Sequence, residues 1–77
     1  MRIIGNIPNP DFRITVFHMN DKYIVKFEAG PMEQTFKFDQ AVFSGIEGIT
    51  KAVDEEFLKK VKARFNEMFL EMKRIEN

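Results

Sequence analysis

The sequence predicts an α+β fold, in which an antiparallel meander of three to four short strands carries one long C-terminal helix on one face. Two patterns lead to this prediction. Residues 12–39 mostly alternate between apolar and polar side chains, as half-buried strands do. From residue 54 onward, apolar residues recur every three or four positions, as in an amphipathic helix. Strands followed by one helix give a sheet with one covered face.

Composition limits the class of protein. The chain has 77 residues, which we expect to form a single domain over 1–77, and its twelve basic residues balance twelve acidic ones. Nucleic-acid binders usually carry a basic excess, which is absent here. There is no cysteine and only one histidine, so we expect no disulfide, no metal site and no cofactor.

The N-terminal residues 1–6 lack the apolar stretch of a signal peptide. No apolar run approaches the roughly 20 residues that a membrane span requires. We therefore expect a cytoplasmic protein with no membrane segment.

The first strand is expected over about 2–7, at the edge of the sheet. Pro8 and Pro10 follow it, and two prolines in three residues suit a stiff turn rather than regular structure.

The next two strands, 12–19 and 22–29, form a hairpin around Asn20-Asp21. Both turn residues tolerate left-handed backbone angles, which a two-residue hairpin turn demands. If Met19 lies directly opposite Lys22, the pairing of all the other residues in the two strands follows. On the apolar face the pairs are His18–Tyr23, Val16–Val25, Ile14–Phe27 and Phe12–Ala29. The other face, expected to be solvated, pairs Arg13 with Glu28 and Thr15 with Lys26.

A fourth strand is expected over 32–39, after the break at Gly30-Pro31. A tight loop places Val25 near Phe36 and Tyr23 near Phe38, although a slip by two residues would keep the same faces. Gln34 is the one polar residue in the buried row.

Residues 40–53 favour a loop with a short helical turn, with continuity into the following helix left open. Ser44 and Glu47 have capping-box spacing. Gly45 and Gly48 oppose a longer helix, because each costs about 1 kcal/mol relative to alanine.

The long helix is expected over 54–75. Asp54 is a plausible N-cap, and Glu55 and Glu56 complement the positive end of the helix dipole. Such a helix is about 33 Å long at 1.5 Å per residue. An eight-residue strand covers only about 27 Å. The C-terminal turns are therefore expected to extend past the sheet.

The apolar stripe of this helix is either core or interface. Core packing is the usual role of such a stripe. However, methionine recurs at binding surfaces, and an exposed apolar patch usually marks an interface. We expect self-association through a candidate interface of Phe65, Met68, Phe69, Met72 and Ile75.

Other groups have ordinary explanations. His18 is expected to pack on Tyr23 at the rim, rather than to act as a general base. The acidic residues 54–56 serve the helix dipole, and the basic run 59–64 is a solvated helix face. Phe17 and Ile24 pair on the face expected to be solvated. They are either a lone apolar pair, which is common on outer faces, or part of a second contact surface.

The segments 13–17, 23–28, 33–38 and 65–69 resemble those of a family of short proteins from Bacteroides-type bacteria, across nearly the whole chain. That resemblance implies no activity. The plan of several strands and one helix, assembled as a dimer, also looks like that of the PUR and positive-cofactor families of single-stranded nucleic-acid binders. This analogy rests on fold shape alone.

We therefore expect a non-enzymatic protein–protein interaction module, present as a homodimer. The alternative is a single-stranded nucleic-acid binder that uses the outer sheet face, with Arg13, Phe17, Lys26 and Lys37 as candidate contacts. A third hypothesis is a small ligand or catalytic site at His18 and Tyr23. No sequence pattern names a partner or a ligand.

Overall fold

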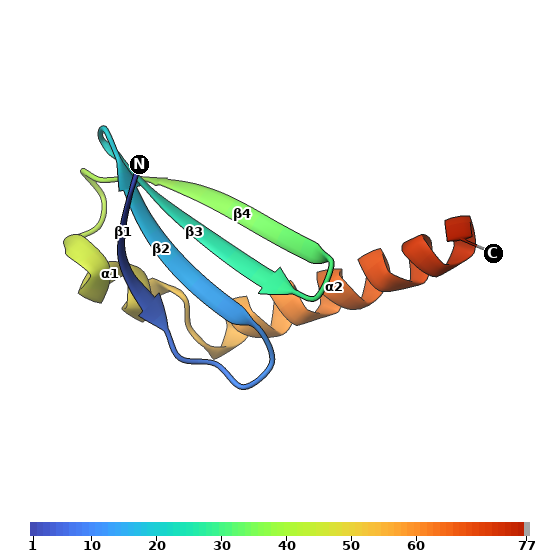
Figure 1. Ribbon diagram of the computed structural model, residues 1–77. Coiled ribbons are helices and arrows are strands. Elements are labelled where there is room, and N and C mark those ends of the chain that lie inside the picture. Colours follow the sequence, from blue (N-terminus) through green and yellow to red (C-terminus); the bar gives the residue numbers. More distant parts are fainter. Residues whose placement is uncertain (77) are drawn as a thin grey trace.

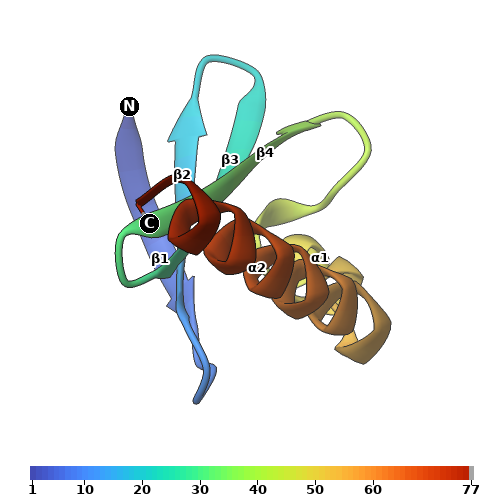
Figure 2. The same ribbon diagram turned by 90° about the vertical axis from the view of Figure 1, so that its right-hand side faces the viewer.

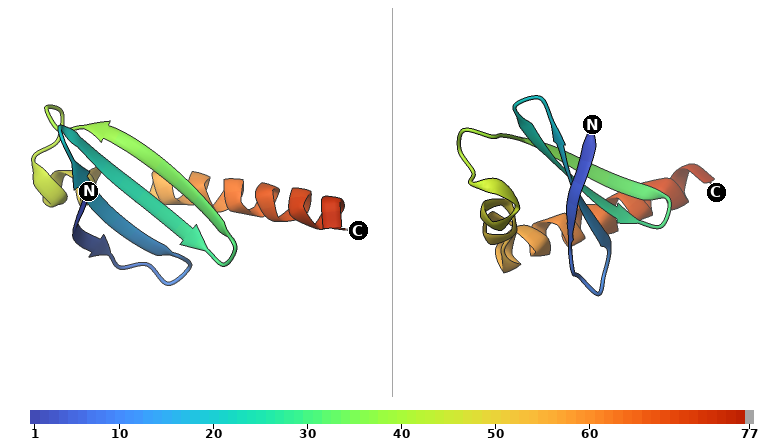
Figure 3. Two further views of the ribbon diagram at one scale, coloured as in Figure 1. Left: turned by 45° about the horizontal axis from the view of Figure 1, so that its top comes forward. Right: turned by 60° about the vertical axis from the view of Figure 1, so that its left-hand side comes forward.

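The computed structural model describes residues 1–76 and has the predicted α+β class. Its elements are β1 (Arg2–Ile7), β2 (Arg13–Met19), β3 (Lys22–Ala29), β4 (Met32–Asp39), α1 (Gly45–Ala52) and α2 (Glu55–Glu76). The strands form one antiparallel sheet in the order β1-β2-β3-β4. Both helices lie on the same side of this sheet, and its other face is open (Figures 1 and 3).

The β2–β3 hairpin has the predicted register. It pairs His18 with Tyr23 and Val16 with Val25. Asn20, the first turn residue, has a φ of 58°, the left-handed conformation that the turn required. The ladder begins at Arg13, so the predicted pair of Phe12 with Ala29 falls outside it.

The β3–β4 hairpin also has the predicted register rather than the version shifted by two. Val25 pairs with Phe36 and Tyr23 with Phe38, in a ladder without irregularity. Gly30 begins the turn with a φ of 60°, which a residue with a side chain rarely adopts.

The edge strand β1 is irregular and is approached by α1. Its register against β2 shifts between Ile3 and Gly5, which marks a bulge. A Cβ atom at Gly5 would overlap Cδ1 of Ile46 on α1, so the end of the Ile46 side chain would have to move to admit one.

The core lies between the sheet and the two helices. Ile14, Val16, Val25 and Phe27 are fully buried from the sheet side, as are Ile49 of α1 and Val61 of α2. The Phe27 ring centroid lies 5.9 Å from that of Phe12, 5.7 Å from Phe36 and 5.8 Å from Phe57. Phenylalanine supplies the large apolar area that a chain of this size needs.

The segment 40–53 is more regular than predicted. It contains the eight-residue helix α1, which Val53 and Asp54 separate from α2. The capping-box prediction at Ser44 is wrong, because its side chain makes no capping hydrogen bond. Gly45 has a φ of 68°, so the chain enters α1 through a left-handed residue rather than with ordinary cap geometry.

Candidate interaction surfaces

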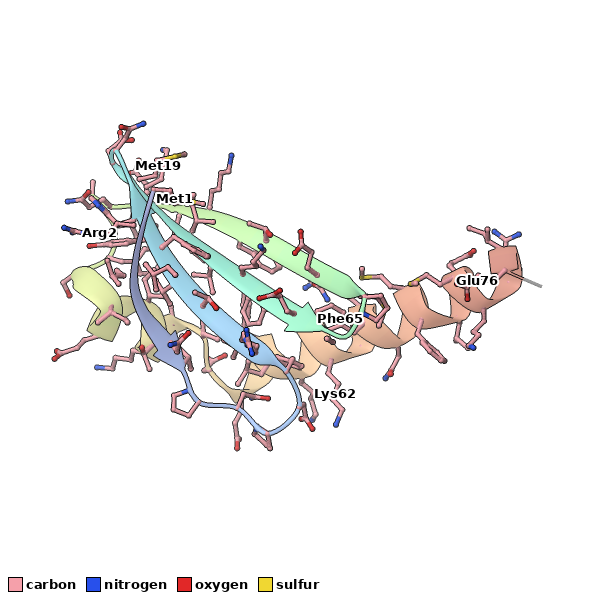
Figure 4. All side chains as sticks on the ribbon, in the orientation of Figure 1. Met1, Arg2, Met19, Lys62, Phe65 and Glu76 are labelled. Atoms are coloured by element: carbon pink, nitrogen blue, oxygen red, sulfur yellow. The ribbon has the colours of Figure 1, made fainter. Side chains whose placement is uncertain are left out.

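The helix α2 covers the sheet with only its N-terminal half. The backbone N–H of Phe57 donates to Oδ1 of Asp54 over 2.9 Å, which confirms Asp54 as a capping residue. Val61 and Phe65 are the buried residues of this helix. Beyond Phe65 the helix continues past the end of the sheet to Glu76 (Figures 1 and 4). This confirms the expected extension.

The extension exposes apolar side chains along one face. We call Met68, Phe69, Met72 and Ile75 the overhang stripe. Phe69 is 47% exposed and Ile75 75%, while Met68 and Met72 are half-buried. The fifth candidate, Phe65, is only 5% exposed and belongs to the core, so the overhang stripe begins one turn later than the predicted interface.

Leu70 is also an exposed apolar residue of α2, but it lies on another side of the helix from the stripe. It is 67% exposed, and at about 100° per residue it points away from the line through Phe65 and Met72. Leu70 therefore provides an internal control for the stripe.

Charged side chains border the overhang stripe. Nη2 of Arg74 lies 2.6 Å from Oε2 of Glu71, and Nζ of Lys73 lies 5.5 Å from the centroid of the Phe69 ring. An open hollow of about 500 Å³ runs along the stripe between α2 and β4. Its lining residues are Gln34, Arg64, Glu67, Met68, Glu71 and Met72. The overhang thus has an apolar centre and a polar border, as interfaces do.

The outer face of the sheet gathers three of the four candidate nucleic-acid contacts. A shallow hollow of about 330 Å³ is lined by Met1, Phe17, Met19, Ile24, Lys26, Thr35 and Lys37. Phe17 lies opposite Ile24 in the ladder, and Ile24 lies opposite Lys37. The fourth candidate, Arg13, is opposite Glu28 and does not line this hollow.

This outer face is less solvated than predicted. Ile24 is only 6% exposed and Thr15 is also buried, although the register places both on the face opposite the core pair Val16–Val25. In the middle of a twisted sheet, long side chains on adjacent strands bury the smaller ones between them. The pair of Phe17 and Ile24 is therefore the centre of a small apolar layer.

Ion pairs partly neutralise the basic side chains of this face. Nζ of Lys26 lies 3.4 Å from Glu33, and Nζ of Lys22 lies 3.8 Å from Asp39. Both pairs are substantially exposed, so each contributes little to stability. They leave less positive charge for a polyanion.

His18 lies at the rim of the sheet. Its ring centroid is 5.4 Å from that of Tyr23, as predicted, and its Nε2 is 2.7 Å from Oε1 of Gln40. This hydrogen bond accounts for the orientation of the ring.

The acidic start of α2 borders an open hollow. This open space of about 790 Å³ lies between the loop 9–12 and the first turns of α2. Asp11 and Lys62 meet across it at 3.5 Å. Within residues 1–76, no group of three His, Asp or Glu side chains is placed to hold a metal ion. The described residues also contain no buried side-chain polar atom that lacks a hydrogen-bond partner.

None of the helices in residues 1–76 is both long enough and apolar enough to cross a bilayer.

Comparison with protein-family models, with curated proteins and with solved structures found no match. The resemblance to the Bacteroides-type family therefore stays a prediction.

The sequence patterns did not predict that β4 forms an open edge of the sheet. β4 is the last strand of the meander, so one of its edges has no neighbouring strand (Figures 1 and 2). The order of the strands could have predicted this open edge. The last strand of an antiparallel meander lies at the edge of the sheet unless a later segment pairs with it.

Proposed function

We propose that this chain is a non-enzymatic, cytoplasmic protein–protein interaction module that self-associates through the overhang stripe. The observation that supports the proposal is that α2 carries its apolar stripe past the sheet, where Phe69 and Ile75 are exposed. In a monomer, continuing an apolar stripe into solvent gives no stability. Covering it with a second molecule does.

A second copy of the overhang is the occupant that we propose. Residues 66–76 carry three carboxylates, at 67, 71 and 76, and two cations, at 73 and 74, which gives a net charge of −1. Two overhangs therefore repel each other only weakly. Packed antiparallel across a two-fold axis, they would bring Met72 against the partner's Met72 and align the two helix dipoles favourably.

Light scattering over a concentration series tests the proposal. The unsubstituted chain should show a mass above that of the 9.1 kDa monomer, and the variant Phe69→Glu/Met72→Glu should move toward the monomer. Leu70→Glu is the matched control, because it adds a charge to the same helical turn on the opposite side. A monomeric mass for the unsubstituted chain at every concentration would refute self-association.

The hollow on the outer face favours single-stranded nucleic-acid binding as the second candidate. Phe17, Lys26 and Lys37 meet there, and an aromatic ring beside ammonium groups suits a stacked base and its phosphate. Titration with short oligonucleotides at low and high salt tests it. Lys26→Glu should weaken binding more than Arg13→Glu, because Arg13 lies outside the hollow. Absence of binding at low salt would remove this candidate.

A further inference from the structure

The two edges of the sheet differ in how they are protected. β1 is six residues long and contains a bulge, while a helix packs on each edge strand, α1 on β1 and α2 on β4. β4 has eight residues in an unbroken ladder, and in Figures 1 and 3 no other element lies alongside its outer edge. A long regular edge is a template for another strand, and proteins usually blunt such edges. β4 is not blunted by a bulge or by a proline within its eight residues.

Alternate residues of β4 direct their backbone groups to that edge. In an antiparallel ladder, every second residue bonds to a given neighbour. Gln40, directly after β4, donates its N–H to the carbonyl oxygen of Asp21 over 2.9 Å. The even-numbered residues therefore bond to β3. The outward N–H and C=O groups belong to the odd-numbered residues, which are Glu33, Thr35, Lys37 and Asp39.

The same four residues place their side chains on the outer face, which restricts how two copies can pair. A two-fold axis perpendicular to the sheet keeps both outer faces on one side, so odd-numbered residues pair with odd-numbered residues. Centring the axis on Thr35 places Glu33 opposite the partner's Lys37, and Lys37 opposite the partner's Glu33. Both contacts join opposite charges.

The neighbouring registers lack this complementarity. An axis at Gln34 opposes Glu33 to the partner's Thr35 and joins no opposite charges. An axis at Phe36 opposes Glu33 to the partner's Asp39. An axis at Glu33 or at Lys37 opposes two identical charges. On the inner face, the register at Thr35 places Met32 beside the partner's Phe38, and both residues are only half-buried in the single chain. Charge and apolar contact thus favour the same register.

We propose that two copies of this chain join their β4 strands antiparallel, with Thr35 on the two-fold axis, into one continuous sheet. The charges that deter unrelated strands from this edge are self-complementary for a second copy. The inference rests on the proposed self-association but uses a surface separate from the overhang stripe.

Disulfide trapping tests the register, because the chain has no native cysteine. Directly opposed residues that bond to each other have Cα atoms about 5.5 Å apart, within the range of about 4.4–6.8 Å that a disulfide requires. Thr35→Cys should therefore cross-link rapidly under mild oxidation. Lys37→Cys is the matched control, since its Cα would lie about 13 Å along the strand from the partner's equivalent atom. Equal or faster cross-linking of Lys37→Cys would overturn the register.

Charge exchange and a proline variant test the contact without cysteine. Glu33→Lys and Lys37→Glu should each weaken the dimer, and the double variant should restore it. Thr35→Pro should remove the β4 contact while preserving the β3–β4 ladder, because the N–H that it removes points outward. Circular dichroism checks that the variant is folded.

The outcomes separate the two proposals. A chain that uses both surfaces forms assemblies larger than a dimer, and each variant then leaves a dimer joined by the other surface. A dimer that survives Thr35→Pro but dissociates with Phe69→Glu/Met72→Glu would overturn the β4 contact and support the overhang. The reverse pattern would support the β4 contact and overturn the overhang. A chain that is monomeric at every concentration would overturn both.

Discussion

The side-chain amide of Gln34 on β4 donates a hydrogen bond to the backbone carbonyl of Val61 in α2, over 2.9 Å. This contact explains the one polar side chain in the buried row of β4. The carbonyl oxygen has a second lone pair beyond the one used within the helix, so the amide is satisfied without breaking the helix. The bond joins the edge strand to the middle of the long helix.

Replacing Gln34 should measure that bond. Gln34→Met keeps the length of the side chain but removes the donor, and should lower the free energy of unfolding by about 1 kcal/mol. Gln34→Glu should lower it further at neutral pH, because a carboxylate would face a carbonyl oxygen. The loss should shrink at acidic pH, where the protonated acid can donate. Urea denaturation of both variants at two pH values gives these differences, and identical stabilities would show that the bond is unimportant.

The N-terminal caps of α1 and α2 predict different stability changes when each capping residue is replaced by alanine. Asp54→Ala should cost about 1 kcal/mol, because its carboxylate accepts the Phe57 N–H. Ser44→Ala should change little, since the Ser44 side chain makes no capping bond. Thermal denaturation of the two variants in parallel checks this, and a larger loss at Ser44 would contradict the assignment of both caps.

The contact between Gly5 and Ile46 should appear as coupling. Gly5→Ala should destabilise the chain by about 1 kcal/mol, because the new methyl group forces Cδ1, the flexible end of the Ile46 side chain, to shift. Ile46→Val removes that atom, so the double variant should recover most of the loss. A double-mutant cycle from chemical denaturation measures the coupling. If the two changes in unfolding free energy simply add, Gly5 of β1 and Ile46 of α1 are not in contact.

The apolar layer on the outer face should contribute to stability. Ile24→Ala should cost about 2–3 kcal/mol, toward the lower end of the usual range for a buried isoleucine. Ile3→Ala, on the same face but at an exposed position of β1, should cost only a few tenths. Equal costs for the two variants would indicate that the outer face is solvated throughout, as the alternation alone implies.

Local patterns predicted most of this fold. Each hairpin turn has two residues, and such a short connection leaves little freedom in register once one face must be apolar. The apolar period of α2 and the Asp54 cap can also be read from neighbouring residues alone. The length of α2 relative to the strands was enough to predict the overhang. It was not enough to predict that Phe65 would lie in the core.

The remaining features depend on contacts between distant segments. The two glycines that argued against α1 fill special places, one with a left-handed backbone and one inside the helix, where tertiary packing of Ile49 outweighs propensity. The burial of Ile24 depends on neighbouring strands rather than on its own alternation. The close approach at Gly5 requires α1 to be in place, so no local pattern signals it.

The projecting end of α2 also changes how the molecule moves through solution. The chain measures 44 × 25 × 18 Å along its principal axes, with a radius of gyration of 13.5 Å. A compact domain of this length would have a radius of gyration near 11.5 Å. The monomer is therefore a prolate particle that diffuses slowly and elutes early from a sizing column, so its elution volume alone would overstate its mass.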